Sequence, residues 1–287
     1  MTIKILLAAL LVPALAFAII PPQPERNATI RIIGGVDAEK NDFPYLVSLQ
    51  LRTRQDLEHF CGGSLLDATT ILTAAHCVRF LSNYGDDAAD VFVRVGSLST
   101  SSGGDLIRAR SLVAHPDSMS LHAEYGSDVG IIKLSDSVPN ADSFEFAALS
   151  LDGSRLRAGT MLSTAGWGQT TPSEYDEYSD RLQKIDVPFV TSKNCEAAYR
   201  KLRQQTRNFH YPEEIDNTMF CAGYTKNTVF VNDQDACPGD SGGPIVHTAS
   251  GAVIGLVSLG MPCGEDGAPG VYANIAGLRD FIDKHMG

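Results

Sequence analysis

The amino-acid sequence predicts an all-β fold, and two observations carry this prediction. First, short runs rich in β-branched and other apolar residues recur along the chain, at 45–51, 91–95, 129–134, 184–190, 244–247 and 252–258. Second, clusters of Gly, Asp, Ser and Pro separate these runs, and such clusters mark turns. Many short strands with turns between them indicate a sandwich or a barrel.

The first 18 residues differ in character from the rest of the chain. Lys4 precedes an apolar run that ends in small residues around Phe17. This pattern is typical of a secretory signal peptide cleaved after Ala18. A membrane anchor is the alternative, but Pro13 interrupts the run, and the later sequence has no apolar stretch of about 20 residues. We therefore expect residues 1–18 to be a signal peptide and the protein to be secreted and extracellular.

Residues 19–31 are rich in proline and lack hydrophobic periodicity, so we expect an extended, removable segment. It contains the chain's one Asn-x-Ser/Thr sequon, at Asn27, whose sugar would leave with the segment. At the other end, Asn274 is placed to cap a helix in which Ile275, Leu278 and residues 281–282 share one face. We expect that helix to pack on the barrel surface.

Composition excludes several classes of function. The 287 residues are 44% hydrophobic, enough for one large core or two smaller ones, and the net charge is -11. An acidic surface repels phosphate backbones and anionic lipids, so neither nucleic acid nor a membrane is expected as a partner.

Six cysteines are present, an even number that favours disulfides in an exported protein. No Cys-x-x-Cys pair occurs, so zinc is not expected. Spacing alone leaves about 15 connectivities open.

Three segments contain residues suited to nucleophilic catalysis: 72–77 with His76, 126–134 with Asp128, and 235–244 with Ser241. A serine hydroxyl is a poor nucleophile at neutral pH, so a base must take its proton as it attacks a carbonyl. Taken singly, each residue has a structural alternative: a satisfied core histidine, a turn carboxylate and a turn serine. Their joint occurrence favours catalysis.

These segments, in this order, resemble the catalytic His, Asp and Ser segments of the chymotrypsin/trypsin family. The resemblance runs from Ile32 to Gly287 and implies a peptidase domain at 32–287. That domain would consist of two packed six-stranded antiparallel β-barrels, at about 32–150 and 151–287, with a C-terminal α-helix. It also implies a catalytic site without a cofactor or a metal.

The resemblance assigns roles to individual residues. His76 would be the general base, Asp128 would orient its ring, and Ser241 would form the acyl-enzyme. The backbone N–H groups of Gly239 and Ser241 would bind the oxyanion. Cleavage between Arg31 and Ile32 would activate a precursor, because the new amino terminus would pair with Asp240 inside the protein.

The expected specificity is for Arg or Lys before the cleaved bond. Asp235 stands where trypsins place the carboxylate at the base of the primary pocket, and Ser258, Gly260 and Gly270 match its walls. Ala236 lacks the hydroxyl that helps the shorter Lys, so we expect Arg to be preferred. The alternative interpretation of Asp235 is an ordinary loop carboxylate. A chymotrypsin-like preference for aromatic residues is disfavoured, because Asp235 would place a charge in the pocket.

The resemblance also implies three disulfides: Cys61 with Cys77, Cys195 with Cys221, and Cys237 with Cys263. In the loop at 97–105, which corresponds to the calcium loop of vertebrate trypsins, only Asp105 is acidic, so calcium is not expected.

The sequence departs from the family in several places. Pro238 stands beside the oxyanion loop, and Leu259 replaces the usual Trp under the substrate residues that precede the Arg. The stretch at 200–207, within the long segment 195–221, is basic; a helical rim that recruits an acidic partner is one interpretation, and a solvated loop is favoured. The loop at 225–234 is also long.

An active endopeptidase is favoured over a non-catalytic homologue that acts as a binding or inhibitory protein, because all the residues named for catalysis are present. We expect protein or peptide substrates, protein protease inhibitors as further partners, and a monomer.

Overall fold

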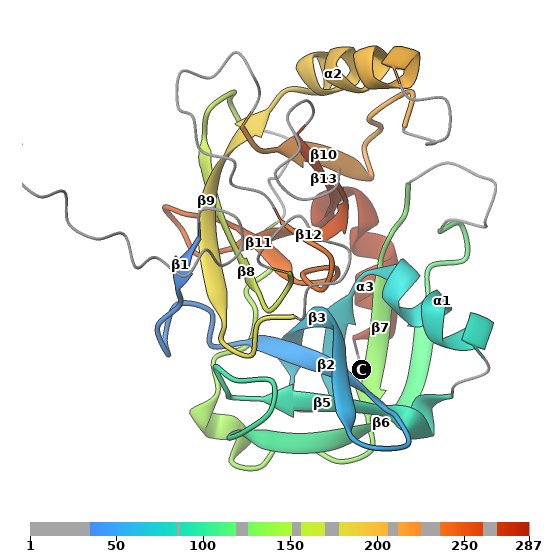
Figure 1. Cartoon of the computed structure of the whole chain (residues 1–287), viewed down its shortest axis with the longest axis vertical. Coiled ribbons are helices and arrows are strands. Elements are labelled where there is room, and N and C mark those ends of the chain that lie inside the picture. The colour runs from blue at the N-terminus through green and yellow to red at the C-terminus, as the bar shows by residue number, and fades with distance from the viewer. Residues whose placement is uncertain are drawn as a thin grey trace, which may run out of the picture.

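The computed structural model describes residues 35–84, 87–118, 126–150, 156–169, 178–205, 212–224, 236–260 and 269–286. Antiparallel strands dominate its regular structure and form two closed barrels, with a helix at the C-terminal end (Figure 1). The all-β class and the two-barrel architecture are thereby confirmed. Within the described ranges, no helix is both long and apolar enough to span a membrane.

The first barrel closes in the strand order β2-β3-β4-β7-β6-β5. Its strands are β2 (Leu46–Arg52), β3 (Leu57–Asp67), β4 (Thr70–Thr73), β5 (Val91–Val95), β6 (Asp105–Ala114) and β7 (Gly130–Leu134). Alternation explains how they face the core: in β5, Val91, Val93 and Val95 are fully buried while the residues between them are partly exposed.

The second barrel runs β9-β10-β13-β12-β11-β8 and closes through pairing of β8 with β9. Its strands are β8 (Met161–Gly166), β9 (Gln183–Val190), β10 (Met219–Ala222), β11 (Pro244–His247), β12 (Val253–Leu259) and β13 (Gly270–Asn274). The short strand β1 (Val36–Asp37) adds to the edge of β9. The early chain therefore contacts the second barrel, although the sequence assigned residues 32–150 to the first.

Helices lie outside the barrels. They are α1 (Ala75–Tyr84), α2 (Ser192–Gln205), α3 (Arg279–His285) and the short 3₁₀ helices η1 (Ala88–Asp90), η2 (Ala141–Ser143) and η4 (Ile275–Leu278). The side chain of Asn274 accepts a hydrogen bond from the backbone N of Ala276 at 3.2 Å, so it caps the C-terminal helical segment as predicted. Phe281 of that segment contacts His115 of the first barrel, with ring centroids 4.8 Å apart.

Helix α2 corrects one expectation. The solvated loop favoured for 200–207 is wrong as far as Gln205, where the chain is helical. Cys195, Tyr199 and Leu202 are buried, and their spacing of four and three residues gives the helix an apolar face. That face packs on β10 and β13 through Cys221 and Val271, which explains why a segment rich in charge forms a stable helix.

The largest core cluster contains residues from both barrels, including Leu49 and Ile131 of the first and Val253 and Leu256 of the second. The barrels therefore share a buried interface, and segments from each meet beside it.

Candidate active site

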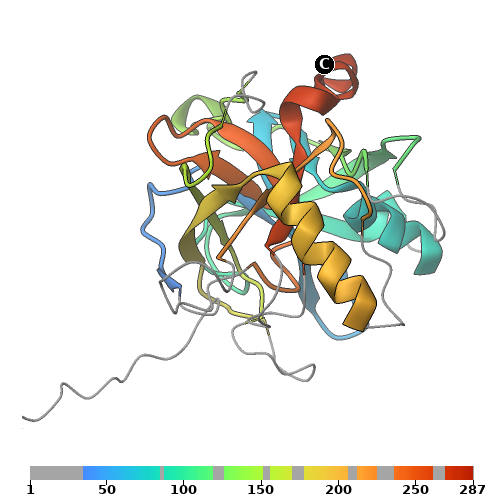
Figure 2. The same ribbon diagram turned by 90° about the horizontal axis from the view of Figure 1, so that it is seen from above.

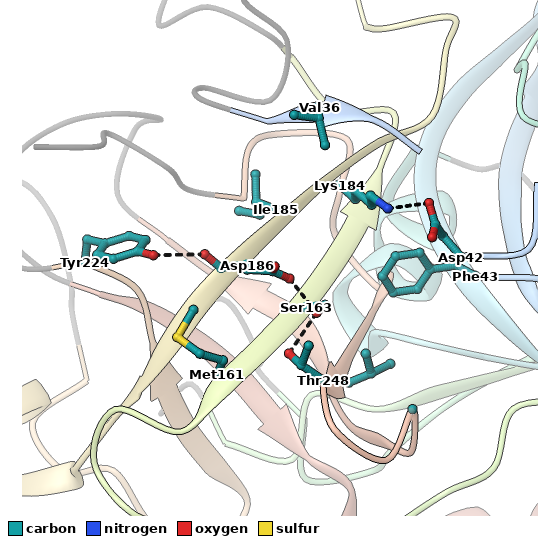
Figure 3. A pocket seen from close by; sticks show the side chains of 12 residues that line it. Val36, Asp42, Phe43, Met161, Ser163, Lys184, Ile185, Asp186, Tyr224 and Thr248 are labelled. Carbon is teal, nitrogen blue, oxygen red and sulfur yellow. Dashed lines mark hydrogen bonds and ion pairs between the residues drawn. The ribbon is translucent and has the colours of Figure 1, made fainter. Parts of the chain in front are cut away.

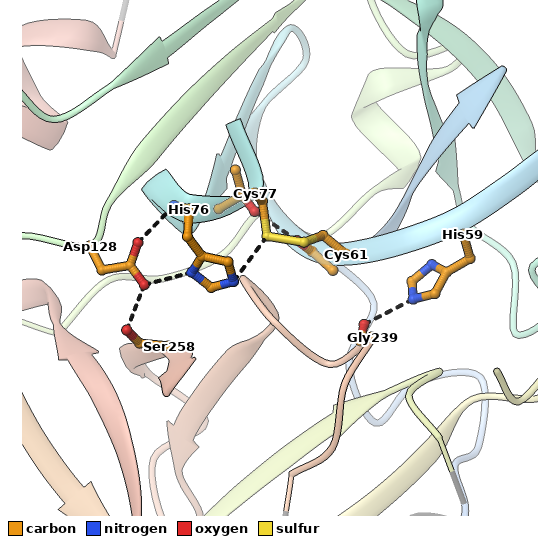
Figure 4. Close-up of a disulfide and its surroundings, with 9 residues drawn as sticks. His59, Cys61, His76, Cys77, Asp128, Gly239 and Ser258 are labelled. Carbon is orange, nitrogen blue, oxygen red and sulfur yellow. Dashed lines mark hydrogen bonds and ion pairs between the residues drawn. A yellow bond between two sulfur atoms is a disulfide. The ribbon is translucent and has the colours of Figure 1, made fainter. Parts of the chain in front are cut away.

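His76 and Asp128 come from neighbouring strands of the first barrel. His76 follows β4 in the first turn of α1, and Asp128 precedes β7. Because β4 and β7 are antiparallel, with Thr73 opposite Gly130, the two side chains meet at one end of the pair. One carboxylate oxygen of Asp128 lies 2.8 Å from His76 Nδ1, and the other accepts the backbone N–H of His76 at 2.9 Å (Figure 4).

Ser258 adds a third hydrogen bond to this carboxylate from the second barrel. Its hydroxyl donates to Asp128 Oδ2 at 2.5 Å (Figure 4). The register of β12 against β13 shifts between Val257 and Leu259, and such a bulge re-aims the side chain between them. Sequence reasoning placed Ser258 in the substrate pocket only, because no local pattern signals a partner 130 residues away.

The Asp128 carboxylate is 2% exposed and the His76 side chain 32% exposed. Burial raises the pKa of Asp128, but the charge of His76 and the hydrogen bonds from His76 and Ser258 outweigh burial, so the pKa lies below 3.8. Burial lowers the pKa of His76, and attraction to Asp128 outweighs it, so that pKa lies above 6.5. The pair thus has an ionised orienting group and an imidazole whose affinity for a proton that group increases.

The segment that carries Ser241 packs against the strands leading to His76. The backbone N–H of Gly62 donates to the Ser241 carbonyl at 2.8 Å. Gly242 has φ +76, and a Cβ there would lie 2.2 Å from Thr73 Oγ1 and 3.0 Å from Ala74 N. Only glycine fits this contact, and it brings the partly exposed Ser241 next to the turn that precedes His76.

Gly239 also needs to be glycine. Its φ is +97, and a Cβ would lie 2.9 Å from Gly168 Cα and from the Tyr178 ring. Its carbonyl is bonded to His59 Nε2 at 2.9 Å (Figure 4), and His59 Nδ1 lies 2.8 Å from the hydroxyl of Ser48. Burial lowers the pKa of His59 to about 4, so the ring is neutral, donates through Nε2 and accepts through Nδ1.

Sequence reasoning missed His59 because it lacks the flanking pattern of a catalytic histidine. The signal that could have found it is weak: a histidine within a strand of an apolar barrel, facing a neighbouring strand with a buried serine. Its role depends on a loop 180 residues away.

Asp240 is buried, at 2% exposure. Its two carboxylate oxygens accept the backbone N–H groups of Gly168 and Cys237, each at 2.8 Å. Burial raises its pKa from 3.8 to about 6, against the effect of these hydrogen bonds. Among the described residues, no cation lies within ion-pair distance of it.

The disulfides Cys61–Cys77 and Cys195–Cys221 are present, which confirms two of the pairings implied by the resemblance. Cys237 is buried and Cys263 lies outside the described residues, so the third stays a prediction. Cys61, His76 and Cys77 are the one group in the described part of the chain with metal-ligand spacing, but the disulfide uses both sulfurs (Figure 4).

The predicted primary pocket is described in part, because Asp235 lies outside the described residues, as do Arg31 and Ile32. Among the described residues, a Cβ on Gly260 would meet only the carbonyl oxygen of Ala236, at 3.9 Å, so these two positions lie close together. Gly270 is the first residue of β13, and a Cβ there would lie 3.3 Å from the ring of Tyr272.

The loop at 97–105 is bound to the second barrel by Asp180. The Asp180 carboxylate accepts the hydroxyls of Ser99 and Thr100 and the backbone N–H of Ser101, at 2.9 to 3.1 Å. The loop thereby holds the residues that follow Tyr178, whose ring packs on Gly239.

A groove of about 650 Å³ lies on the flank of the second barrel (Figure 3). Lys184 Nζ is paired with Asp42 at 2.6 Å at one end, and Ser163 donates to Asp186 at 2.5 Å in the middle. None of the residues predicted to be catalytic lines it, so this groove and the predicted catalytic site are separate.

The comparisons with known proteins agree with this geometry. The family model for trypsin matches residues 32–282. A trypsin of Phaedon cochleariae is 34% identical over 276 residues, which is 96% of each chain. Trypsin 5G1 of Aedes aegypti is 34% identical over 90% of this chain and 85% of its own, and trypsin theta of Drosophila erecta is 35% identical over 88% and 85%. The chain therefore belongs to the trypsin family and is a trypsin-like serine endopeptidase.

Proposed function

We propose that this endopeptidase is secreted, is activated by cleavage between Arg31 and Ile32, and hydrolyses peptide bonds after Arg in preference to Lys. The observation that carries the catalytic part is the buried carboxylate of Asp128, which holds His76 by its ring and its backbone at once. A carboxylate bonded in this way selects the tautomer whose Nε2 accepts a proton.

In the proposed reaction, Ser241 Oγ attacks the carbonyl carbon of the scissile bond while His76 Nε2 takes its proton. The imidazolium, stabilised by Asp128, then gives that proton to the leaving amine, which leaves an acyl-enzyme on Ser241. A water molecule, which gives its proton to His76 Nε2, then attacks the acyl-enzyme, and the carboxylic acid product leaves as Ser241 Oγ regains a proton. The backbone N–H groups of Gly239 and Ser241 bind the negative oxygen of each tetrahedral intermediate.

Several contacts support the oxyanion site. The positive φ of Gly239 sets the orientation of the peptide groups on either side of it, and the hydrogen bond from His59 to the Gly239 carbonyl fixes that orientation. Tyr178 and Gly168 pack against the same residue. Donors held this firmly lower the barrier by about 3 kcal/mol each, because they need no reorganisation during the reaction.

The proposed specificity rests on Asp235, with Ala236, Ser258, Gly260 and Gly270 around the pocket. Gly260 has no side chain that would obstruct a long substrate side chain, and it lies close to the carbonyl of Ala236. A carboxylate at the closed end of the pocket demands a cation. Since Ala236 cannot bind the water that would bridge to a shorter Lys, the guanidinium of Arg is the better ligand.

The proposed activation rests on the environment of Asp240. Its buried carboxylate has two backbone donors and a raised pKa, so a cation would be strongly attracted to it. The ammonium group of Ile32, released by cleavage after Arg31, is that cation. A signal peptide at 1–18 accounts for export, and protein or peptide substrates and protein inhibitors are the expected partners of a monomer.

The test compares Arg, Lys and Phe reporter peptides after the secreted precursor has been cleaved after Arg31 by an added protease that is then removed. We expect hydrolysis in the order Arg, Lys, Phe for the wild type and for Ser135→Ala, a surface control, and none for Ser241→Ala. Equal rates for Arg and Lys would overturn the preference, and no Ser241-dependent hydrolysis would overturn the catalytic proposal.

A further inference from the structure

Helix α2 lies on the outside of the second barrel, beside β10 (Figures 1 and 2). Its outward face is formed by exposed residues at helical spacing: Lys193, Ala197, Arg200, Lys201 and Gln204. Three of the five are cations and none is an acid. In a chain with 34 acidic and 23 basic side chains, this face has the opposite sign to the protein as a whole.

The other two charged residues of α2 have structural partners. Glu196 accepts the backbone N–H of Ile215 at 3.1 Å, and the guanidinium of Arg203 donates to the carbonyl of Pro212. In contrast, Lys193, Arg200 and Lys201 form no ion pair within the described ranges. In the described part of the chain, Glu196 and Arg203 therefore have structural partners, whereas the three outward cations form no ion pair.

The electrostatics of the helix do not account for these cations. Lys193 lies in the first turn, where the helix dipole disfavours a positive charge, and no acidic residue occupies that turn. Glu196 stands four residues before Arg200, a favourable spacing, but it is bonded to Ile215. Neither the helix dipole nor an ion pair among the described residues therefore uses these three cations, and they are exposed to a partner.

The helix stands next to the substrate side of the proposed active site. Its buried face, with Ala198 and Tyr199, belongs to the cluster on which Leu259 packs. Leu259 directly follows Ser258, whose hydroxyl binds Asp128. If the chain binds substrates as proposed above, the residues ahead of the cleaved Arg lie over Leu259 and lead towards α2.

We propose that the basic face of α2, formed by Lys193, Arg200 and Lys201, binds an acidic stretch of the protein substrate ahead of the cleaved Arg. This inference rests on the proposed function and adds a substrate class to it. A helix is about 10 Å across and an extended chain advances about 3.3 Å per residue, so roughly three further residues carry the substrate from Leu259 to the outer face. Acidic residues about five to eight positions ahead of the Arg are therefore within reach.

The test compares two peptides that share the same four residues before the Arg and differ only in positions five to eight, which are Asp or Ser. For the activated wild type at low ionic strength, we expect kcat/KM for the acidic peptide to exceed that for the neutral one by roughly 5- to 20-fold, the combined effect of about three exposed ion pairs. In about 0.5 M salt the ratio should fall to within about 2-fold, because exposed charges are screened.

The variant Lys193→Gln/Arg200→Gln/Lys201→Gln should lose the preference at low salt. Its matched control is Arg54→Gln/Arg108→Gln/Arg110→Gln, which removes the same charge from exposed positions of the first barrel and should keep the preference. A four-residue Arg reporter should be cleaved equally by all three proteins. Cleavage of the reporter with no acidic preference in the wild type, or the same loss in both variants, overturns the inference; no cleavage of the reporter would overturn the proposed function itself.

Discussion

Asp240→Asn should abolish the loss of stability that the uncleaved chain undergoes as pH rises, and it should inactivate the cleaved enzyme. In the uncleaved chain the Asp240 carboxylate is buried with two backbone donors and no cation among the described residues. Asn has the shape of the acid and removes the charge, but its NH2 group cannot accept a hydrogen bond, so one of the two backbone N–H groups loses its acceptor. That loss costs about 1–3 kcal/mol at every pH, whereas the effect of the charge depends on pH. After cleavage the same substitution leaves the proposed Ile32 ammonium without its counter-charge.

The magnitude follows from the pKa. Burial raises the pKa of Asp240 from 3.8 to about 6, and each pKa unit corresponds to about 1.4 kcal/mol. The folded state therefore holds a proton between pH 3.8 and about 6 that the unfolded state releases, so stability is lost as pH rises through this window. The penalty is complete above about pH 6, at about 3 kcal/mol. Losing the ion pair in the cleaved enzyme should cost about 3–5 kcal/mol in the opposite direction.

The assay uses urea unfolding of an uncleavable precursor that carries Arg31→Gln and Ser241→Ala, with or without Asp240→Asn. The chain has one tryptophan, Trp167, which is 1% exposed and precedes Gly168, so its fluorescence reports unfolding close to the site. Taking the difference between the two proteins at each pH cancels the titration of His59 and His76, which both share.

We expect the stability of the substituted precursor, relative to the precursor with Asp240, to rise by about 3 kcal/mol between pH 4 and pH 7. A difference that does not change between these two pH values would refute the reasoning about burial. In cleaved protein with Ser241 intact, the Asp240→Asn variant should hydrolyse the Arg reporter at least about 100-fold more slowly. Full activity there would refute the proposed ion pair.

Three further predictions address the site and its support. Asp128→Asn should lower kcat on the order of 10⁴-fold, because an amide favours the wrong tautomer of His76. Because the neutral ring of His76 is the base, activity is lost as pH falls through the pKa of His76. Without the charge of Asp128, burial lowers this pKa, so the acid limb of the kcat/KM profile should move to lower pH. An acid limb that does not move would contradict the assignment of Asp128. Gly242→Ala should lower the free energy of unfolding in urea by several kcal/mol, and Gly251→Ala should lower it by about 1 kcal/mol. Both glycines have positive φ, but a Cβ at 242 would lie 2.2 Å from Thr73 Oγ1, whereas one at 251 would meet nothing within 4 Å. Equal losses would show that backbone strain alone sets the cost. Replacing Cys195 and Cys221 together with Ala should lower the free energy of unfolding by roughly 3 kcal/mol, since the disulfide closes a loop with a sequence separation of 26, and an unchanged unfolding midpoint would contradict this.

The fold class was predictable because strand periodicity and turn residues are local features, readable one segment at a time. The cap at Asn274 was predictable for the same reason. The helix α2 was not, although its buried residues have helical spacing, because the basic stretch at 200–207 outweighed a short apolar face that becomes stable only against β10 and β13.

The sequence by itself determined that this is an all-β protein with the ordered segments of a trypsin-like peptidase around His76, Asp128 and Ser241. These follow from residue type and order along the chain. Only the tertiary structure decided that Ser258 shares the carboxylate of Asp128, that His59 holds the carbonyl of Gly239, and that Asp240 is buried between two backbone donors. The bonds of Ser258 to Asp128, of His59 to Gly239 and of Gly168 to Asp240 each join segments far apart in the sequence. No local pattern encodes such a partner, because the two segments meet only once the chain has folded.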